Sequence, residues 1–313
     1  MDPARLPSGY RLRPPAWGES SQVNRLSAIC DAALGSAPSL TEGMIRLMWE
    51  RPRFVLATDA WIVENGPTIV GYGHVWDEAP GRLSGFAFVH PDHVGRGIGT
   101  RLAELVEARA AAKAPGGGRL YSAVLAQDEV GAGLLARRGY SWARRFWHME
   151  IELAGYREEP TPPVGVELRP VNGERDLRHV HRLLEEAFED HWDHAPTSYE
   201  EFLDLNVRGE DFDPSLWFMA LEDGEPVGAV CGNAHPDRGW VDEVGVRRSH
   251  RGRGVGSALL RACFGAFASR GLPRARLNVD SDNPTGAVSL YERVGMHVVS
   301  SFDLWERALP AAR

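Results

Sequence analysis

The sequence predicts an α/β protein of two tandem domains, each a mixed β-sheet flanked by helices. Three observations carry this expectation: a set of segments that recurs at a spacing of about 156 residues, a strand–loop–helix junction present in both copies, and a proline-rich stretch between them. A length of 313 residues also corresponds to two ordinary domains.

The repeat consists of three matched segments in the same order. Residues 10–14 recur as 166–170, residues 89–99 as 246–256, and residues 137–140 as 293–296. The spacing is about 156 residues for the first and last pairs and about 157 for the middle pair. Such matches indicate a duplicated domain. Residues 154–165 hold three prolines and read as a linker, so we expect domains over 1–156 and 164–313.

Each half has the same predicted order of elements. An opening strand leads into helices over residues 20–34 and 41–50, and over 175–190 and 198–207 in the second half. Hairpins follow, with strands over 54–63 and 68–75, and over 216–221 and 227–231. Next come a strand into a glycine-rich loop, a long helix, a strand over 120–125 or 275–280, a short helix and closing strands. One right-handed crossover implies a mixed sheet covered by helices.

The junction at residues 244–257 is the most informative stretch. An apolar strand end runs into a glycine-rich loop that opens into a helix with one apolar face, formed by Val255, Ala258, Leu259, Ala262, Cys263, Ala266 and Phe267. Gly252, Gly254 and Gly256 let the backbone turn tightly and let a ligand approach its amides. Because unpaired N–H groups and the macrodipole attract anions to a helix N-terminus, we expect a pyrophosphate site here.

Five basic side chains surround this predicted anion site: Arg247, Arg248, His250, Arg251 and Arg253. The whole chain has a net charge of −8 and a pI near 5.8, which argues against nucleic acid or an anionic membrane as a partner. The local cluster therefore fits a small polyanion. A Walker loop is excluded because no lysine follows the glycines. A dinucleotide fingerprint, which Asp280 would support, and a plain surface loop stay open as alternatives.

The three cysteines, Cys30, Cys231 and Cys263, lie far apart in the sequence, which predicts reduced core residues of a cytoplasmic protein. The N-terminal stretch has no apolar segment resembling a signal peptide. No apolar run reaches the roughly 18 residues of a membrane span. We therefore expect no membrane partner, and the sequence leaves the oligomeric state open.

Arg251, Gly254 and Gly256 form the pattern Arg-x-x-Gly-x-Gly at a strand-to-helix junction. This stretch resembles motif A of the GNAT superfamily of N-acetyltransferases, and the resemblance covers nearly the whole chain. It implies two GNAT domains, acetyl-CoA as the acetyl donor, a small-molecule amine as the acceptor, and no metal. The residues that it assigns to the coenzyme are Val244, Gly245, Val246, Arg251, Gly252, Arg253, Gly254, Val255, Gly256, Ser257 and Asn283, with Arg96, Gly97 and Gly99 in the first half.

Acetyl transfer needs a base, because an ammonium has no lone pair, and it benefits from an acid at the departing thiolate. Asp242 and Glu243 lie on the strand before the loop, and alternation of strand side chains predicts that only one faces the active site. Many GNAT members carry a glutamate base at the position of Trp240, whereas Asp242 matches the acidic position of the diamine acetyltransferases. We favour Asp242 as the base, with Glu243 second. Tyr291 matches the tyrosine that serves the family as general acid.

The same spacing applied to the first half finds no such groups. Gly97 and Gly99 are kept, but Val94 stands at the position of Arg251 and Leu135 at that of Tyr291. Gly85 and Phe86 occupy the positions of the two carboxylates. We therefore expect a catalytically silent N-terminal domain and a catalytic C-terminal domain.

The acceptor pocket of GNAT folds includes the segment after the first helix. Its counterpart here holds the candidate acceptor contacts His191, Trp192, Asp193 and His194, for which a metal site or a polar helix cap are the alternatives. The tandem layout and length resemble the mycothiol synthases, which acetylate the cysteinyl amine of a glucosaminyl-inositol conjugate. An acetyltransferase for another small amine fits equally well, and a non-catalytic acyl-CoA sensor is the alternative from another class.

Overall fold

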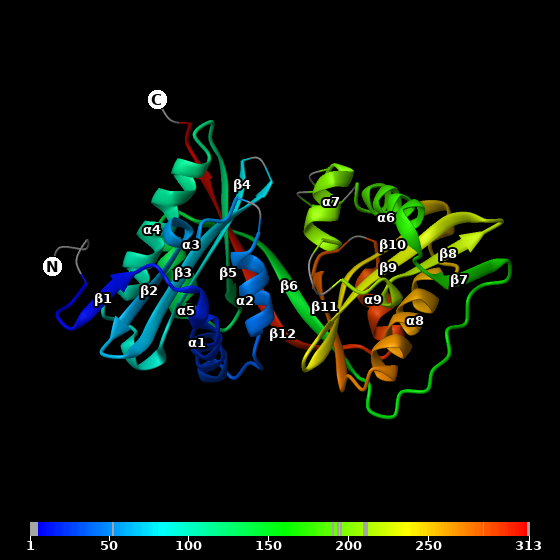
Figure 1. Cartoon of the computed structure of the whole chain (residues 1–313), viewed down its shortest axis with the longest axis horizontal. Coiled ribbons are helices and arrows are strands. Elements are labelled where there is room, and N and C mark those ends of the chain that lie inside the picture. The colour runs from blue at the N-terminus through cyan, green and yellow to red at the C-terminus, as the bar shows by residue number, and fades with distance from the viewer. Residues whose placement is uncertain are drawn as a thin grey trace. The chain divides into compact units, whose positions relative to one another are not determined.

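The computed structural model describes residues 6–51, 53–79, 81–189, 191–192, 194, 196–208, 212–283 and 285–311. Its contacts divide the chain into two compact units, and Figure 1 shows their elements. Unit 1 comprises residues 1–145 and 300–313, and unit 2 comprises residues 146–299. Each unit combines parallel and antiparallel strands with its own helices, so the predicted α/β class with two mixed sheets flanked by helices is confirmed. No helix among the described residues is long and apolar enough to cross a membrane.

Unit 2 contains a sheet of strand order β7-β8-β9-β10-β11-β6. The β10–β11 pair is parallel and the other neighbours are antiparallel. The strands are β7 (Val166–Pro170), β8 (Phe218–Glu222), β9 (Glu225–His235), β10 (Arg238–Val246), β11 (Arg274–Asp280) and the end of β6 (Ser141–Glu152). The helices are α6 (Gly173–Phe188), α7 (Tyr199–Asn206), α8 (Val255–Ser269) and α9 (Ala287–Arg293).

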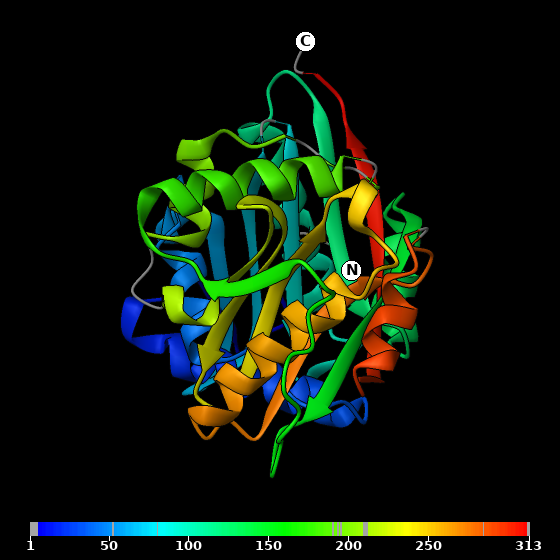
Figure 2. The same cartoon turned by 90° about the vertical axis from the view of Figure 1, so that its right-hand side faces the viewer.

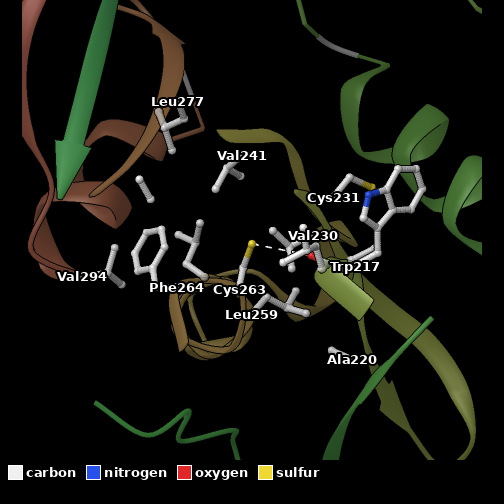
Figure 3. Packing of buried hydrophobic residues seen from close by; sticks show 14 of the residues in the cluster. Trp217, Ala220, Val230, Cys231, Val241, Leu259, Cys263, Phe264, Leu277 and Val294 are labelled. Atoms are coloured by element: carbon white, nitrogen blue, oxygen red, sulfur yellow. Dashed lines mark hydrogen bonds between the residues drawn. The ribbon is translucent and has the colours of Figure 1, made fainter. Parts of the chain in front are cut away.

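Helices α6 and α8 cover opposite faces of this sheet, as Figure 2 shows with α6 above the strands and α8 below them. A side chain at Gly239 would meet Phe267 of α8, whereas one at Gly245 would meet Leu184 and Ala187 of α6. The core on the α8 side joins Phe264 and Leu259 to Val241, Leu277 and Val294 (Figure 3). The two cysteines predicted to be core residues here, Cys231 and Cys263, are buried free thiols.

Unit 1 repeats this plan with the strand order β1-β2-β3-β4-β5-β12, in which only β4–β5 is parallel. Its strands are β1 (Tyr10–Arg13), β2 (Ala60–Asn65), β3 (Thr68–Ala79), β4 (Arg82–Val89), β5 (Gly118–Leu125) and the end of β12 (His297–Leu309). Its helices are α1 (Ser20–Ala33), α2 (Glu42–Trp49), α3 (Leu56–Asp59), α4 (Ile98–Lys113) and α5 (Glu129–Arg137).

The closing strands of the two units are exchanged. Strand β6 follows the first half in sequence, but its residues 146–152 pair with β11 of unit 2. Strand β12 follows the second half, but its residues 302–309 pair with β5 of unit 1. The division by contacts therefore differs from the predicted one at 1–156 and 164–313, which assumed that each half closes its own sheet. A sequence repeat reports the order of elements and cannot report which sheet a strand joins.

The first strand of the first hairpin begins later than predicted, and the second strand ends later. Residues 56–59 form helix α3 rather than the beginning of a strand, so β2 begins at Ala60. The cause is Asp59, whose buried carboxylate accepts a hydrogen bond from the Val55 N–H at 2.9 Å. Arg109 and Lys113 of α4 pair with the same carboxylate at 2.6 and 3.1 Å. A carboxylate with this many partners fixes a local turn against the β-propensity of the sequence.

Candidate active site in unit 2

The parallel strands β10 and β11 pair only at their beginnings. Gly239 is opposite Ala275 and Trp240 is opposite Arg276, and the described residues of the two strands have no pairing beyond this point. On its other edge β10 stays paired with β9, except for a β-bulge between Val241 and Glu243. Asp242 is the extra residue of this bulge. The bulge and the separation of the strands coincide, so the carboxylates lie where backbone groups of β10 are left open.

The bulge changes which way the carboxylates point. Glu243 is the cross-strand partner of Cys231, whereas Val241 is the partner of the adjacent Gly232, which faces α8. Glu243 therefore shares the α6 face of the sheet with Gly245. The prediction that only one of Asp242 and Glu243 can face the site is wrong in its premise, because strict alternation does not hold across a bulge.

The pKa values of both carboxyl groups are raised, so each group keeps its proton to a higher pH than an ordinary acid does. Asp242 keeps access to solvent, yet surrounding protein displaces enough water to raise its pKa to about 8, with a further rise from the negative charge of Glu243. Burial raises the pKa of Glu243 to about 7, and Glu185 of α6 adds to the rise. A hydrogen bond from Asn233 Nδ2 to Asp242 Oδ2, 2.8 Å long, acts in the opposite direction. Two interacting acids of this kind titrate as a pair near neutral pH.

The segment after α6 is tied to the same helix through Glu185. The Thr197 hydroxyl donates to Glu185 Oε1 at 2.8 Å, and His194 Nε2 lies 3.5 Å from Glu185 Oε2. Because Glu185 also acts on Glu243, the predicted acceptor residue His194 is linked to the carboxylates by one side chain. His191 instead stands against Phe188, with its Nδ1 3.2 Å from the Trp192 carbonyl oxygen.

Asp193, the fourth predicted acceptor residue, lies outside the described residues. In the described part of the chain no three acidic, histidine or cysteine side chains gather as a metal site would require.

The glycine loop has the geometry of an open helix N-terminus. Gly252 and Gly254 have left-handed φ angles of 75° and 96°, and a Cβ at either would meet no atom within 4 Å. Gly254 caps α8 without a side-chain hydrogen bond. The loop glycines Gly252 and Gly254 are exposed, whereas Val255 and Gly256, the first residues of α8, are buried. Gly256 has a different role, because a Cβ there would lie 3.0 Å from Leu290 of α9.

The basic side chains of the loop are engaged by protein groups. Arg251 donates to the carbonyl oxygens of Val246 and Ala187, at 3.1 and 3.0 Å, and so joins the end of β10 to the end of α6. Arg253 and His250 both bind Glu222 at the end of β8, the latter at 2.8 Å. Hydrogen bonds from Arg253 and His250 lower the pKa of Glu222 to about 2. Glu222 was not singled out from the sequence.

The remaining predicted residues surround the junction of α8 and α9. Val255, the first residue of α8, is 1% exposed, and this figure includes its backbone. Tyr291 is 8% exposed, and burial raises its pKa to about 12, which keeps the phenol protonated. No described residue hydrogen-bonds its hydroxyl. Asn283 Oδ1 accepts from the N–H and the hydroxyl of Thr285, so this side chain organises the turn before α9.

Unit 1 has an aromatic cluster at the equivalent place. Phe86 is the cross-strand partner of His74, just as Glu243 is that of Cys231, so Phe86 stands at the position of Glu243. Phe86 stacks on Trp76 at 5.3 Å and contacts His74 at 5.6 Å. Burial lowers the pKa of His74 to about 3, and the ring is therefore neutral. No group in this cluster can act as a base at neutral pH.

Asp242 has no counterpart in unit 1. Gly85 was predicted to match it, but Gly85 pairs with Val75, as Val241 pairs with Gly232. Gly85 therefore corresponds to Val241, and a side chain there would clash with Val106 of α4. The glycine loop of unit 1 is similar to that of unit 2, with Gly97 in a left-handed conformation before α4 and Gly99 close to Leu134 of α5.

Two further predicted positions in unit 1 are Arg96, the counterpart of Arg253, and Leu135. Arg96 donates to the Tyr10 hydroxyl at 3.0 Å. Leu135, at the position of Tyr291, is 7% exposed.

Comparison with known proteins gives the family. Residues 29–140 and 177–296 each match the model of the acetyltransferase (GNAT) family. The chain belongs to this family and is an N-acetyltransferase with two GNAT domains. Among its relatives, the mycothiol acetyltransferase of Thermobispora bispora is 32% identical over 290 residues, covering 89% of this chain and 92% of that protein. That of Streptomyces avermitilis is 34% identical over 244 residues, covering 75% of each.

Solved structures show the same similarity. A GCN5-related N-acetyltransferase from Sphaerobacter thermophilus is 30% identical, with a TM-score of 0.85 over 98% of both chains. A tandem GNAT protein of the clavulanic acid biosynthesis pathway has a TM-score of 0.71 at 19% identity, covering 96% of this chain and 98% of its own. The latter supports the fold alone. The sensor without turnover is not favoured by these relatives.

Proposed function

We propose that unit 2 carries the catalysis and transfers an acetyl group from acetyl-CoA directly to a primary amine of a small molecule. The observation that carries this proposal is the β10 bulge, which sets Asp242 and Glu243, with pKa values of about 8 and 7, just before an open helix N-terminus. Bound acetyl-CoA would supply an activated acyl group as a thioester. The amides that follow Gly252 and Gly254 would hold its pyrophosphate.

The carboxylate pair has the properties of a base for an ammonium. Near neutral pH the pair shares about one proton, because each charge opposes the ionisation of the other. The ionised member takes a proton from the incoming ammonium and leaves a lone pair on nitrogen. When the pKa of a base lies near the working pH, a large fraction of the base is deprotonated and its affinity for a proton is still high.

Tyr291 supplies the proton at the other end of the reaction. Its phenol, with a pKa of about 12, stays protonated at every pH at which the carboxylates work. The hydroxyl has no described hydrogen-bond partner and is therefore available to a ligand. Leu290, its neighbour on α9, packs at Gly256 of α8, which holds α9 beside the helix whose N-terminus would bind the pyrophosphate.

For the acceptor we propose an amine related to that of the mycothiol acetyltransferases, since those relatives cover most of this chain. Trp240 stands where many GNAT members carry a glutamate base, which makes another small amine the second candidate. One sequence feature distinguishes the enzymes that would use these two acceptors, namely the position of the acidic residue on β10.

The test is mass-spectrometric detection of acetylated product from acetyl-CoA and a panel of small amines that includes the cysteinyl-glucosaminyl-inositol conjugate. Tyr291→Phe should lower product formation by about 100-fold or more. Tyr156→Phe is the matched control, because its hydroxyl is also buried in unit 2 without a partner among the described residues. Equal loss in both variants, or no product with any amine, would contradict the proposal.

A further inference from the structure

Asn233 is a polar side chain directly beside the carboxylate pair. It lies on β9 as the cross-strand partner of Trp240, just before the bulge. Its Nδ2 donates to Asp242 Oδ2 at 2.8 Å. Its carbonyl oxygen Oδ1 is buried and accepts no hydrogen bond from any described residue. A buried acceptor without a donor is unfavourable and calls for a missing partner.

The surroundings of the pair lack positive charge. No lysine or arginine among the described residues forms an ion pair with Asp242 or Glu243. The titratable groups that face Asp242 are Glu243 on its own strand, Cys231 on β9 and Cys263 on α8, while Glu185 of α6 acts on Glu243. Burial raises the pKa of both thiols, so they stay neutral. The groups that face this point among the described residues thus include no cationic donor.

We propose that Asn233 receives the acceptor amine: Nδ2 fixes the carboxylate of Asp242 while Oδ1 accepts one N–H of the substrate ammonium. This inference rests on the proposed function and adds the residue that positions the amine. A second N–H of the ammonium then points at the carboxylate pair. Transfer of that proton gives a carboxylic acid and a neutral amine, and the new lone pair attacks the thioester carbonyl.

Asn233 also selects for the chemical class of the acceptor. An alcohol of the same length presents one O–H and no charge, so it cannot donate to Oδ1 and to a carboxylate together. A tertiary ammonium has a single N–H, so it also cannot donate to Oδ1 and to a carboxylate together. The site therefore favours primary ammonium groups, and this preference should depend on the carbonyl of Asn233.

The first variant is Asn233→Leu, which keeps the size of the side chain and removes both polar atoms. Because an unpaired buried carbonyl is removed with the bond, the melting temperature should stay equal or rise. The KM for the acceptor amine should increase about tenfold or more. The acidic limb of the pH profile of kcat/KM should move to higher pH, because the lost bond favoured the charged form of Asp242. An Asn233 that only holds Asp242 would shift the pH profile in the same way but would leave the KM for the acceptor amine unchanged.

Asn65→Leu is the matched control, since Asn65 also donates one amide hydrogen bond, to the Gly9 carbonyl at 3.1 Å, but lies in unit 1. It should leave KM and the pH profile unchanged. An unchanged KM for the acceptor amine in Asn233→Leu would overturn the proposal.

A second measurement does not depend on turnover. Propylammonium and propanol are titrated into the full-length protein, and NMR follows the Asn233 side-chain amide and the Asp242 carboxyl carbon. The signals should shift with propylammonium and not with propanol, and the Asp242 shift should weaken in Asn233→Leu. If the wild type acetylates amines but these signals stay still, the role of Asn233 is refuted while the enzyme stands. If the signals shift but no amine is acetylated, the proposed function fails and the amine site stands.

Discussion

At the scale of single residues, the raised pKa of Glu243 links activity and stability to pH. Its pKa of about 7 exceeds the ordinary 4.5, so between these values the native state holds a proton that the unfolded state has released. The free energy of unfolding therefore falls as pH rises through this window, whereas the deprotonated base needed for activity increases. Stability and catalysis make opposite demands on this one carboxyl group.

Glu243→Gln should separate these two effects. The variant should melt several degrees above the wild type at pH 8 and close to it at pH 4, because the cost of a charged Glu243 arises only at the higher pH. Its kcat should fall at pH 8. Thermal melts at both pH values, with Glu225→Gln as an exposed control on β9, check this. A melting difference that is independent of pH would contradict it.

The chemistry of individual residues was only partly readable from the sequence. The glycines, Tyr291 and the two carboxylates were visible because each belongs to a local pattern. Arg251 was expected at a phosphate, but its guanidinium joins two backbone carbonyls. Asn233, Glu185 and Glu222 were not visible, because their contacts come from segments far away in the chain.

At the scale of elements, the β10 bulge distinguishes the two units. Along β10, residues before the bulge correspond to β4 at a spacing of about 156 and residues just after it at about 157, since Gly85 matches Val241 while Phe86 matches Glu243. The change of spacing between matched segments was present in the sequence. Spacing alone does not locate the extra residue, because a hairpin turn and a strand can each absorb one residue.

Deletion of Asp242 should convert β10 into a regular strand. All other β9–β10 pairs can stay as they are, since Val241 and Glu243 already oppose the adjacent residues Gly232 and Cys231. We expect a folded protein with a circular-dichroism spectrum like that of the wild type and activity below one hundredth of it. Full activity in the deletion variant would show that neither the bulge nor Asp242 matters.

The loop before α8 allows a prediction for the donor. Glu222 binds Arg253 and His250, so these two side chains must break their contacts with Glu222 before they can contact phosphate oxygens. Glu222→Gln should weaken this hold and lower the KM for acetyl-CoA a few-fold, most clearly at low salt. Steady-state kinetics at two ionic strengths test it, with Glu225→Gln as the control, and an increased KM would contradict it.

At the scale of the whole molecule, the exchanged strands make the two halves of the sequence dependent on each other. Val164 in the linker is 99% exposed and offers a place for an engineered protease site. After cleavage there, the pieces should elute together from a size-exclusion column, because each provides the closing strand of the other's sheet. They should separate only in denaturant.

Truncation provides the control for this experiment. A chain that ends at residue 299 loses the β12 segment that pairs with β5, so unit 1 should be destabilised although its own sequence half is intact. Separation of the cleaved pieces in native buffer, together with a stable truncated chain, would contradict the exchange. The tandem fold was predictable from the repeat, but the exchange was not, because pairing between distant strands leaves no periodic signal.

The exchange also bears on the order in which a growing chain can fold. The first segment of unit 1 ends at Arg145, and its sheet lacks a strand until residues 302–309 have been translated. At about 5–20 residues per second, that delay amounts to roughly 10–30 s. During this time the edge of β5 stays open on the ribosome to any other strand. Nascent chains of this protein should therefore need protection that an ordinary pair of successive domains does not.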